Sequence, residues 1–152
     1  MKEYSYKFKT RIERLGDIGP VFCRPENVTE WLRGKAWEAE EDWKEHCVAV
    51  FTNKANRVIG FETISVGTQD KCILDPKPIC RTAIDILADG IIIIHNHPSG
   101  NPMPSKADIE RVHEIKTALN CLQIKFLDFI IMGEKQAYSY ATESKFKLSC
   151  QK

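Results

Sequence analysis

The sequence lacks any apolar segment of the roughly 20 residues that a membrane-spanning helix needs, and its first residues lack the hydrophobic core of a signal peptide. These two absences exclude a helical membrane protein and give no indication of secretion. We therefore expect a cytoplasmic protein with no membrane partner.

Neither sign of charge dominates the chain. Its 22 lysine and arginine residues nearly balance 21 aspartate and glutamate residues, which gives a formal net charge of +1. A protein that binds nucleic acid over a broad surface usually carries a clear excess of basic residues. The balance therefore gives no support to DNA association, although it is compatible with a local basic patch.

The cysteines form no Cys-x-x-Cys pair, the spacing typical of structural zinc sites and of thioredoxin-like redox sites. Six cysteines are scattered at positions 23, 47, 72, 80, 121 and 150. In a sequence without a secretion signal, this scatter favours separate thiols over a disulfide framework. It indicates a reducing compartment such as the cytoplasm.

What is present is the composition of an ordinary globular domain. The 152 residues, 43% of them hydrophobic and 28% charged, suffice for one domain with a substantial core. We divide the chain into an N-terminal arm or edge strand (1–20), a folded domain (21–145) and a C-terminal tail (146–152).

Apolar periodicity predicts the elements of this domain. Helices are expected at 25–33, 75–88 and 105–121, and strands at 4–9, 46–52, 57–66, 91–94, 124–132 and 137–140. The helical residues expected to face inward are Val28, Trp31, Leu32, Ile79, Ala83, Ile84, Leu87, Val112, Ile115, Leu119 and Leu122. Strands interleaved with helices, one strand pair forming a hairpin, predict a three-layer α/β/α domain with a mixed central sheet.

The stretch that follows Ile91–Ile94 contains side chains suited to binding a metal ion. Successive strand residues point to opposite faces, so His95 and His97 project the same way, roughly 6–7 Å apart. Asn96 points to the other side. Two imidazoles at this spacing can reach one metal ion, because zinc–nitrogen bonds are roughly 2.0–2.1 Å long.

The next residues bring a carboxylate to the two histidines. Prolines and Gly100 force a turn, Ser105 opens a helix, and Asp108 lies one turn inside it. A set of two histidines and one carboxylate leaves a coordination position for water, which is typical of a catalytic zinc site. The pattern predicts one Zn²⁺ per chain, held by His95, His97 and Asp108.

The same residues allow other interpretations. Ser105 and Asp108 ahead of an apolar helix also match a capping box, and the two roles can coexist. Manganese or iron would accept a similar ligand set. His46 and His113 lie outside the pattern and are predicted not to bind metal. Ser99 is not expected to be a nucleophile, because no base remains once both histidines hold metal.

Two other metal-dependent classes fit poorly. An HNH nuclease spreads its motif over a long ββα unit, and the contiguous His-Asn-His found here argues against that class. A zinc deaminase needs His-x-Glu followed by Pro-Cys-x-x-Cys, and neither half is present.

The stretch resembles the JAMM (MPN-type) metalloprotease motif, in which His-x-His is followed by seven residues and then Ser-x-x-Asp. Its sequence, His-Asn-His-Pro-Ser-Gly, is similar to the motif of the RadC branch of that superfamily. The resemblance extends over roughly residues 25–143, through the segments 45–58, 67–68, 75–77, 127–128 and 138–140. It implies a JAMM/MPN domain of cytidine-deaminase-like architecture over residues 21–145.

The resemblance also implies a function, which is zinc-dependent hydrolysis of a peptide or isopeptide bond in a protein substrate. JAMM enzymes take their general base from an upstream glutamate, which by resemblance is Glu45; Glu38, Glu40 and Glu41 compete on composition alone. Glu45 would hold the zinc-bound water, take its proton and pass it to the leaving amine. Ser105 would donate a hydrogen bond to the developing oxyanion, unless it is only a helix cap.

Two departures from the family accompany this resemblance. Relatives usually have the sequence Leu-Asp-His in the C-terminal strand region, and in this chain Phe129 replaces the histidine. The N-terminal helical-hairpin DNA-binding region of full-length relatives is not expected in this chain. The alternative function is a metal-binding accessory protein in DNA repair or mobile-element biology, without peptidase activity. The intact ligand set argues against an inactive scaffold. We also expect that the chain can form a homodimer through an exposed sheet edge or helix.

Overall fold

The computed structural model describes residues 19–33, 35–36, 43–67 and 74–148. The elements are, in chain order, α1 (Pro25–Leu32), β1 (Glu45–Thr52), β2 (Val58–Gly67), α2 (Pro76–Asp85), β3 (Gly90–Asn96), α3 (Lys106–Cys121), β4 (Lys125–Met132), β5 (Gln136–Ser139) and β6 (Ser144–Lys147). The predicted strand at 4–9 and the competing glutamates Glu38, Glu40 and Glu41 lie outside the described residues.

The strands form one six-stranded sheet in the order β2-β1-β3-β4-β5-β6. Neighbouring strands are antiparallel except β3 and β4, which are parallel and are connected through α3. Every residue of β1 and of β3 is buried, because both are central strands covered on two faces. The predicted mixed sheet is confirmed.

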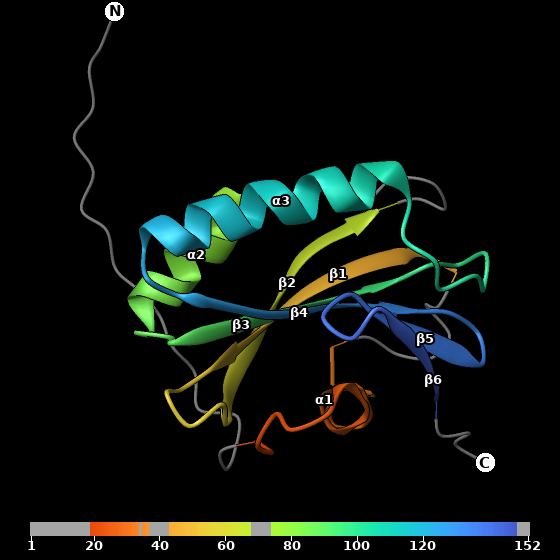
Figure 1. The fold of residues 1–152 in the computed structure, drawn as a ribbon, viewed down its shortest axis with the longest axis horizontal. Coiled ribbons are helices and arrows are strands. Elements are labelled where there is room, and N and C mark those ends of the chain that lie inside the picture. Colours follow the sequence, from red (N-terminus) through yellow and green to blue (C-terminus); the bar gives the residue numbers. More distant parts are fainter. Residues whose placement is uncertain (1–18, 34, 37–42, 68–73, 149–152) are drawn as a thin grey trace, which may run out of the picture.

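Helices cover both faces of this sheet, with α2 and α3 on one side and α1 on the other (Figure 1). The α2/α3 side is filled by a cluster that includes Ala49, Ile91, Ile93, Ile115 and Leu119. The α1 side is filled by a second cluster that includes Val28, Leu32, Val50, Ile92 and Ile94. Alternate residues of each central strand therefore belong to different cores, and the predicted three-layer α/β/α fold is confirmed.

Three helical residues predicted to face inward are exposed instead. Ile84, Leu87 and Leu122 are 51%, 83% and 40% exposed. Ile84 follows Ile79 by five residues, which places it about 140° around the helix from that buried residue. Leu87 lies beyond the end of α2, in a left-handed backbone conformation with φ of 53°, and Leu122 is the residue that follows α3. The sequence prediction also ended the sheet at 137–140 and missed β6.

None of the helices in the described part of the chain, the longest of which has 16 residues, has the length and hydropathy that a bilayer crossing requires.

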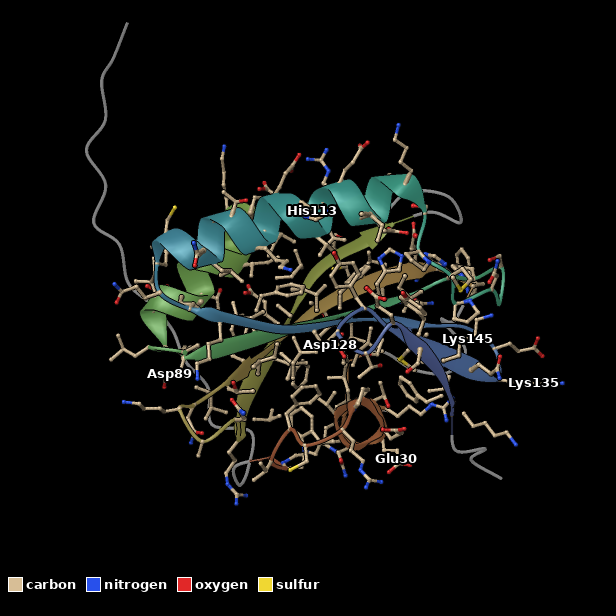
Figure 2. The ribbon with its side chains drawn as sticks, in the orientation of Figure 1. Glu30, Asp89, His113, Asp128, Lys135 and Lys145 are labelled. Carbon is tan, nitrogen blue, oxygen red and sulfur yellow. The ribbon has the colours of Figure 1, made fainter. Side chains whose placement is uncertain are left out.

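A buried carboxylate ties the end of β5 to β4. Asp128, labelled in Figure 2, is 1% exposed. It accepts hydrogen bonds from the backbone N–H groups of Phe129 and Ala141 and, at 2.6 Å, from the Ser139 hydroxyl. Ser139→Ala removes a donor from a buried carboxylate, and we expect it to lower the free energy of unfolding by about 1–3 kcal/mol. Urea denaturation measures this loss.

The exposed Ser144 provides the control for that measurement. Ser144→Ala is expected to change the free energy of unfolding by less than about 0.5 kcal/mol. Equal effects of the two substitutions would show that the hydroxyl on Asp128 does not stabilise the fold.

Candidate metal site

The antiparallel register of β1 and β3 brings Glu45 to the two histidines. The last paired residues of these strands are Cys47 and His95, so the start of β1 lies beside the end of β3. Glu45 Oε1 is 2.7 Å from His95 Nε2, and both side chains are buried. The glutamate that the family resemblance indicates is therefore in direct contact with the first histidine of the motif.

His97 and Asp108 form the second contact of the site. His97 Nε2 lies 3.4 Å from Asp108 Oδ2. The other ring nitrogen of His97, Nδ1, is 2.9 Å from the carbonyl oxygen of Asn101, to which it can donate a hydrogen bond. When the ring is neutral, this bond favours the tautomer with its lone pair on Nε2, an arrangement common among metal-binding histidines.

These contacts bring three predicted site residues within reach of one metal ion and place Asp108 beside one of them. The potential ligand atoms of Glu45, His95 and His97 all lie within 4.8 Å of one another, and Asp108 adjoins the group through His97. The two imidazole rings are nearly perpendicular, with centroids 4.9 Å apart. Imidazole nitrogen and carboxylate oxygen are ligands that Zn²⁺ accepts, so the residues fit a divalent metal ion.

A capping box holds Asp108 in place. The Ser105 hydroxyl accepts a hydrogen bond from the Asp108 backbone N–H and donates one to Asp108 Oδ2 at 2.7 Å, and the Ser105 backbone N–H donates to the same oxygen. Asp108 is only 8% exposed, so these bonds fix a carboxylate that faces the metal site. Ser105 is thus a helix cap, the alternative that the sequence left open beside its oxyanion role.

The electrostatics of the site favour a charged pair at His97 and Asp108. Burial acts to lower the pKa of His97, but its hydrogen bonds to Asp108 and to the Asn101 carbonyl outweigh this effect, and the pKa is raised above 6.5. Burial acts to raise the pKa of Asp108, but hydrogen bonds from His97 and Ser105 hold it well below its usual range. Asp108 therefore favours its ionised form.

The turn after His97 is fixed by its contact with the end of β4. Gly100 has a left-handed φ of 81°, its N–H donates to the His97 carbonyl, and its carbonyl accepts from the Glu134 N–H. A Cβ on Gly133 would lie 2.3 Å from the Gly100 carbonyl oxygen, so only glycine permits this close approach. The loop that presents Asp108 is thereby anchored to the sheet.

Phe129, the departure from the family pattern, lies against the site. Its ring packs edge to face on the imidazole of His95, with ring centroids 6.1 Å apart. A phenyl ring cannot accept a hydrogen bond in the plane of an imidazole N–H as a histidine nitrogen can. Among the described residues, neither His95 Nδ1 nor Glu45 Oε2 has a hydrogen-bond partner. Phe129 therefore gives His95 an apolar support.

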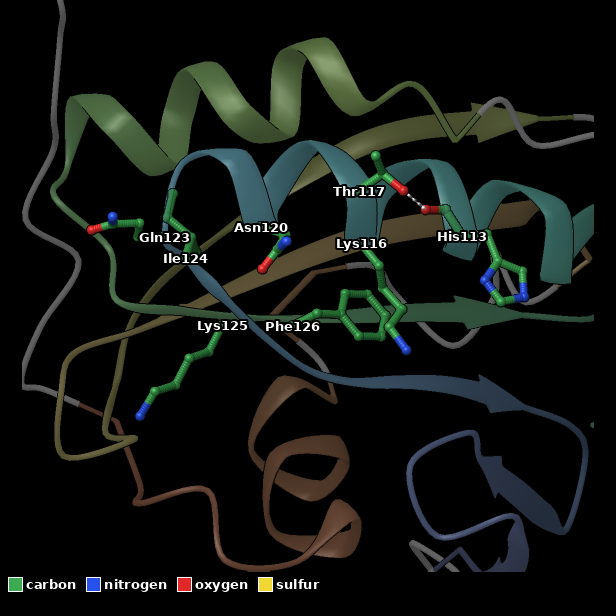
Figure 3. Close-up of a pocket in the computed structure, with 8 residues that line it drawn as sticks. All are labelled: His113, Lys116, Thr117, Asn120, Gln123, Ile124, Lys125 and Phe126. Carbon is green, nitrogen blue, oxygen red and sulfur yellow. Dashed lines mark hydrogen bonds between the residues drawn. The ribbon is translucent and has the colours of Figure 1, made fainter.

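The remaining histidines lie apart from the metal site. His46 follows Glu45 on β1 and by strand alternation points to the opposite face of the sheet. His113 is exposed on α3 and lines a shallow polar hollow between α3 and β4 (Figure 3). This hollow contains none of the four site residues. Ser99 lies in the turn, where its hydroxyl accepts a hydrogen bond from the Asn101 N–H.

Sequence reasoning missed the hydrogen-bonding roles of Asn96 and Asn101. The Asn96 carboxamide bonds to the backbone beside Glu45, and the Asn101 carbonyl orients His97. Strand alternation correctly places the Asn96 side chain away from the histidines. What it contacts depends on pairing with a strand 50 positions earlier, which no local pattern encodes.

Comparison with known proteins places these features in a family. A family profile described as the RadC-like JAB domain matches residues 22–145. A UPF0758 protein of Caldanaerobacter subterraneus is 42% identical over 96 residues, which are 63% of this chain and 41% of that protein. A UPF0758 protein of Chlorobaculum parvum is 34% identical over 139 residues, 91% of this chain and 61% of the relative.

A third relative, from Carboxydothermus hydrogenoformans, is 37% identical over 134 residues, 88% of this chain and 58% of that protein. The chain thus spans about half the length of the curated relatives that it matches. The range matched by the family profile includes all the residues of the metal site.

Proposed function

Because the chain belongs to the RadC-like JAB domain family, we propose that it is a JAMM-type zinc hydrolase that cleaves a peptide or isopeptide bond. The observation that carries this proposal is the meeting of Glu45 with His95 and of His97 with Asp108 at one end of the sheet. The relatives are longer, so the activity and partners of their whole chains are part of the proposal.

In this proposal, His95, His97 and Asp108 hold one Zn²⁺ per chain. The Asn101 carbonyl orients His97, and the Ser105 cap orients Asp108, so two of these side chains are fixed before metal binds. When bound, zinc would act as a Lewis acid and lower the pKa of a water molecule toward roughly 7. Manganese or iron would fit similar ligands, and competitive loading of the metal-depleted chain with equal zinc, manganese and iron would distinguish them.

Glu45 is the proposed general base. Its Oε1 contacts His95 and its Oε2 has no partner among the described residues, so one oxygen is available to accept a proton. The carboxylate would take a proton from the attacking water and deliver it to the leaving amine. Its burial beside the histidines keeps this transfer inside the site.

Ser105 has a second proposed role that the cap does not exclude. Its hydroxyl hydrogen is directed to Asp108 Oδ2 in this structure. Donation to a developing oxyanion would require this hydrogen to turn away from Asp108. The two roles therefore compete for one hydrogen, and the Ser105→Ala variant described in the Discussion separates them.

We also propose a reducing compartment, the cytoplasm, as the place of action. The four described cysteines, at positions 23, 47, 80 and 121, form no disulfide with one another. This is the state expected of thiols under cytoplasmic redox conditions.

Zinc affinity is expected to decrease as the pH is lowered. The decrease should begin at a higher pH than it would if the pKa of His97 were unshifted. Zinc needs neutral Nε2 on His97, and the raised pKa of His97 means that a proton occupies this atom already above pH 6.5. Because the pKa of Asp108 is lowered, that residue stays ionised and adds no pH dependence in this range. Titration against a chromophoric chelator between about pH 5 and 8 measures the effect. A constant affinity over this range would contradict it.

The proposed activity is tested with zinc-loaded protein, reduced casein and a branched peptide that contains a Gly–Lys isopeptide bond. Mass spectrometry should detect new termini or release of the branch, and removal of zinc by a chelator should stop the reaction. If the protein binds zinc but cleaves neither probe at any of the pH values tested, this result would count against peptide hydrolysis.

A further inference from the structure

Asn96, which separates the two histidines of the motif, makes a specific pair of contacts on the opposite face of β3. Its Oδ1 accepts a hydrogen bond from the His46 backbone N–H at 2.6 Å, and its Nδ2 donates one to the Lys44 carbonyl at 2.9 Å. The residue is only 5% exposed. Its carboxamide thus binds the backbone immediately before and immediately after Glu45.

The position of these bonds in the sheet is informative. The ladder between β1 and β3 ends at Cys47 and His95, one residue short of Asn96. Beyond that pair, the Asn96 side chain continues the connection by bonding to an N–H and a C=O of the facing chain, as a backbone would. From the other side, β2 holds Glu45 through its pairing with Gly67. The Glu45 backbone is therefore fixed between β2 and the Asn96 carboxamide.

We propose that Asn96 is a positioning residue that holds the Glu45 carboxylate against the His95 imidazole. The three-residue segment 95–97 then has two roles. His95 and His97 face the candidate metal site, and Asn96 fixes the backbone of Glu45, the proposed base. The assignment of Glu45 as base rests on the proposed function. The mechanical link from Asn96 to Glu45 and His95 is independent of it.

The chemistry of the contact selects asparagine. The facing backbone offers one donor and one acceptor, and a carboxamide supplies the complementary acceptor and donor on a short stem. Aspartate keeps the acceptor but loses the donor, and it would place a carboxylate oxygen beside the Lys44 carbonyl. Leucine has a similar shape and loses both bonds. Asn96→Leu and Asn96→Asp are therefore graded disruptions of one contact.

Asn53 provides a matched control at the other end of β1. Its Oδ1 also accepts backbone hydrogen bonds, from Ala55 and Arg57, each at 3.0 Å. Asn53→Leu removes backbone-to-carboxamide bonds from the turn that follows β1, beyond the end of the strand opposite to Glu45. A general loss of stability would appear in this variant as well, whereas a positional effect on Glu45 would not.

The test uses the metal-free full chain with ¹⁵N-labelled histidine. Long-range ¹H–¹⁵N spectra report the ring nitrogens of His95 in wild type, Glu45→Gln, Asn96→Leu, Asn96→Asp and Asn53→Leu. We expect both Asn96 variants to move the His95 signals in the direction that Glu45→Gln moves them, and Asn53→Leu to leave them in place. If Asn96→Leu does not fold, Asn96→Asp provides the readout.

The proposal is overturned if the His95 signals of the folded Asn96 variants stay at their wild-type positions. It is also overturned if Glu45→Gln itself leaves them unchanged, because the contact that Asn96 is said to maintain would then be absent in solution. With zinc bound, we expect kcat of the Asn96 variants to fall by about 10- to 100-fold and zinc occupancy to persist. A wild type that binds no zinc would defeat the proposed function and leave the spectroscopic result standing.

Discussion

Glu45→Gln is expected to lower the rate of hydrolysis by about 10²- to 10⁴-fold while zinc binding persists. Glutamine keeps the size of the side chain and can still donate or accept a hydrogen bond at His95, but it cannot take a proton from water. The loss should appear in kcat and should not be relieved by more substrate. Cleavage of reduced casein and the branched peptide, with zinc measured in the same samples, gives both readouts.

The structure makes this experiment discriminating, because Glu45 could also be a metal ligand. Its carboxylate belongs to the group of potential ligand atoms that includes both motif histidines. If Glu45→Gln loses zinc together with activity, Glu45 is a ligand and the assignment of the base is wrong. Glu62→Gln is a suitable control, since Glu62 lies on β2 and pairs with Arg81 and Thr82 of α2.

Asp108→Asn is expected to weaken zinc binding by about 100-fold or more. If Asp108 is a direct ligand, as we propose, removing its charge should cost at least as much as the 10- to 100-fold loss typical of residues that only orient ligands. The side-chain oxygen of asparagine can still accept the hydrogen bonds that Ser105 donates to Asp108 Oδ2, so the fold should persist. Competition with a chromophoric chelator measures the affinity, and unfolding in urea verifies the fold.

Ser105→Ala separates the cap from the oxyanion role. Loss of the hydroxyl cap is expected to lower the free energy of unfolding by about 0.5–2 kcal/mol. If Ser105 only orients Asp108, activity at saturating zinc should return nearly to the wild-type rate. If it also donates to the oxyanion, kcat should stay about 10²- to 10³-fold lower at full zinc occupancy.

The sequence could predict that His95 and His97 lie together because their placement is local. Strand alternation alone puts His95 and His97 on one face, and the spacing of Ser105 and Asp108 defines a capped helix start. The structure confirms the cap and places Asp108 beside His97. These relations span few residues, so periodicity and capping rules suffice to find them.

The contacts that complete the site depend on long-range strand pairing. Glu45 and His95 are brought together by the register of β1 against β3, which no local pattern specifies. Composition could not distinguish Glu45 from its acidic neighbours; the family resemblance, and its place at the start of the first strand of the domain, singled it out. Similarly, the sequence showed that Phe129 departs from the family pattern, but its packing on His95 follows from the parallel pairing of β3 and β4.

The most direct test of the central claim is the zinc content of the metal-depleted chain after equilibrium dialysis against zinc. Wild type, His97→Ala and the matched His113→Ala should be compared, because His113 is an exposed histidine of α3 outside the site. We expect about one zinc per chain in wild type and in His113→Ala, and little in His97→Ala. Equal zinc content in all three proteins, or none in wild type, would contradict a metal centre at the end of β3.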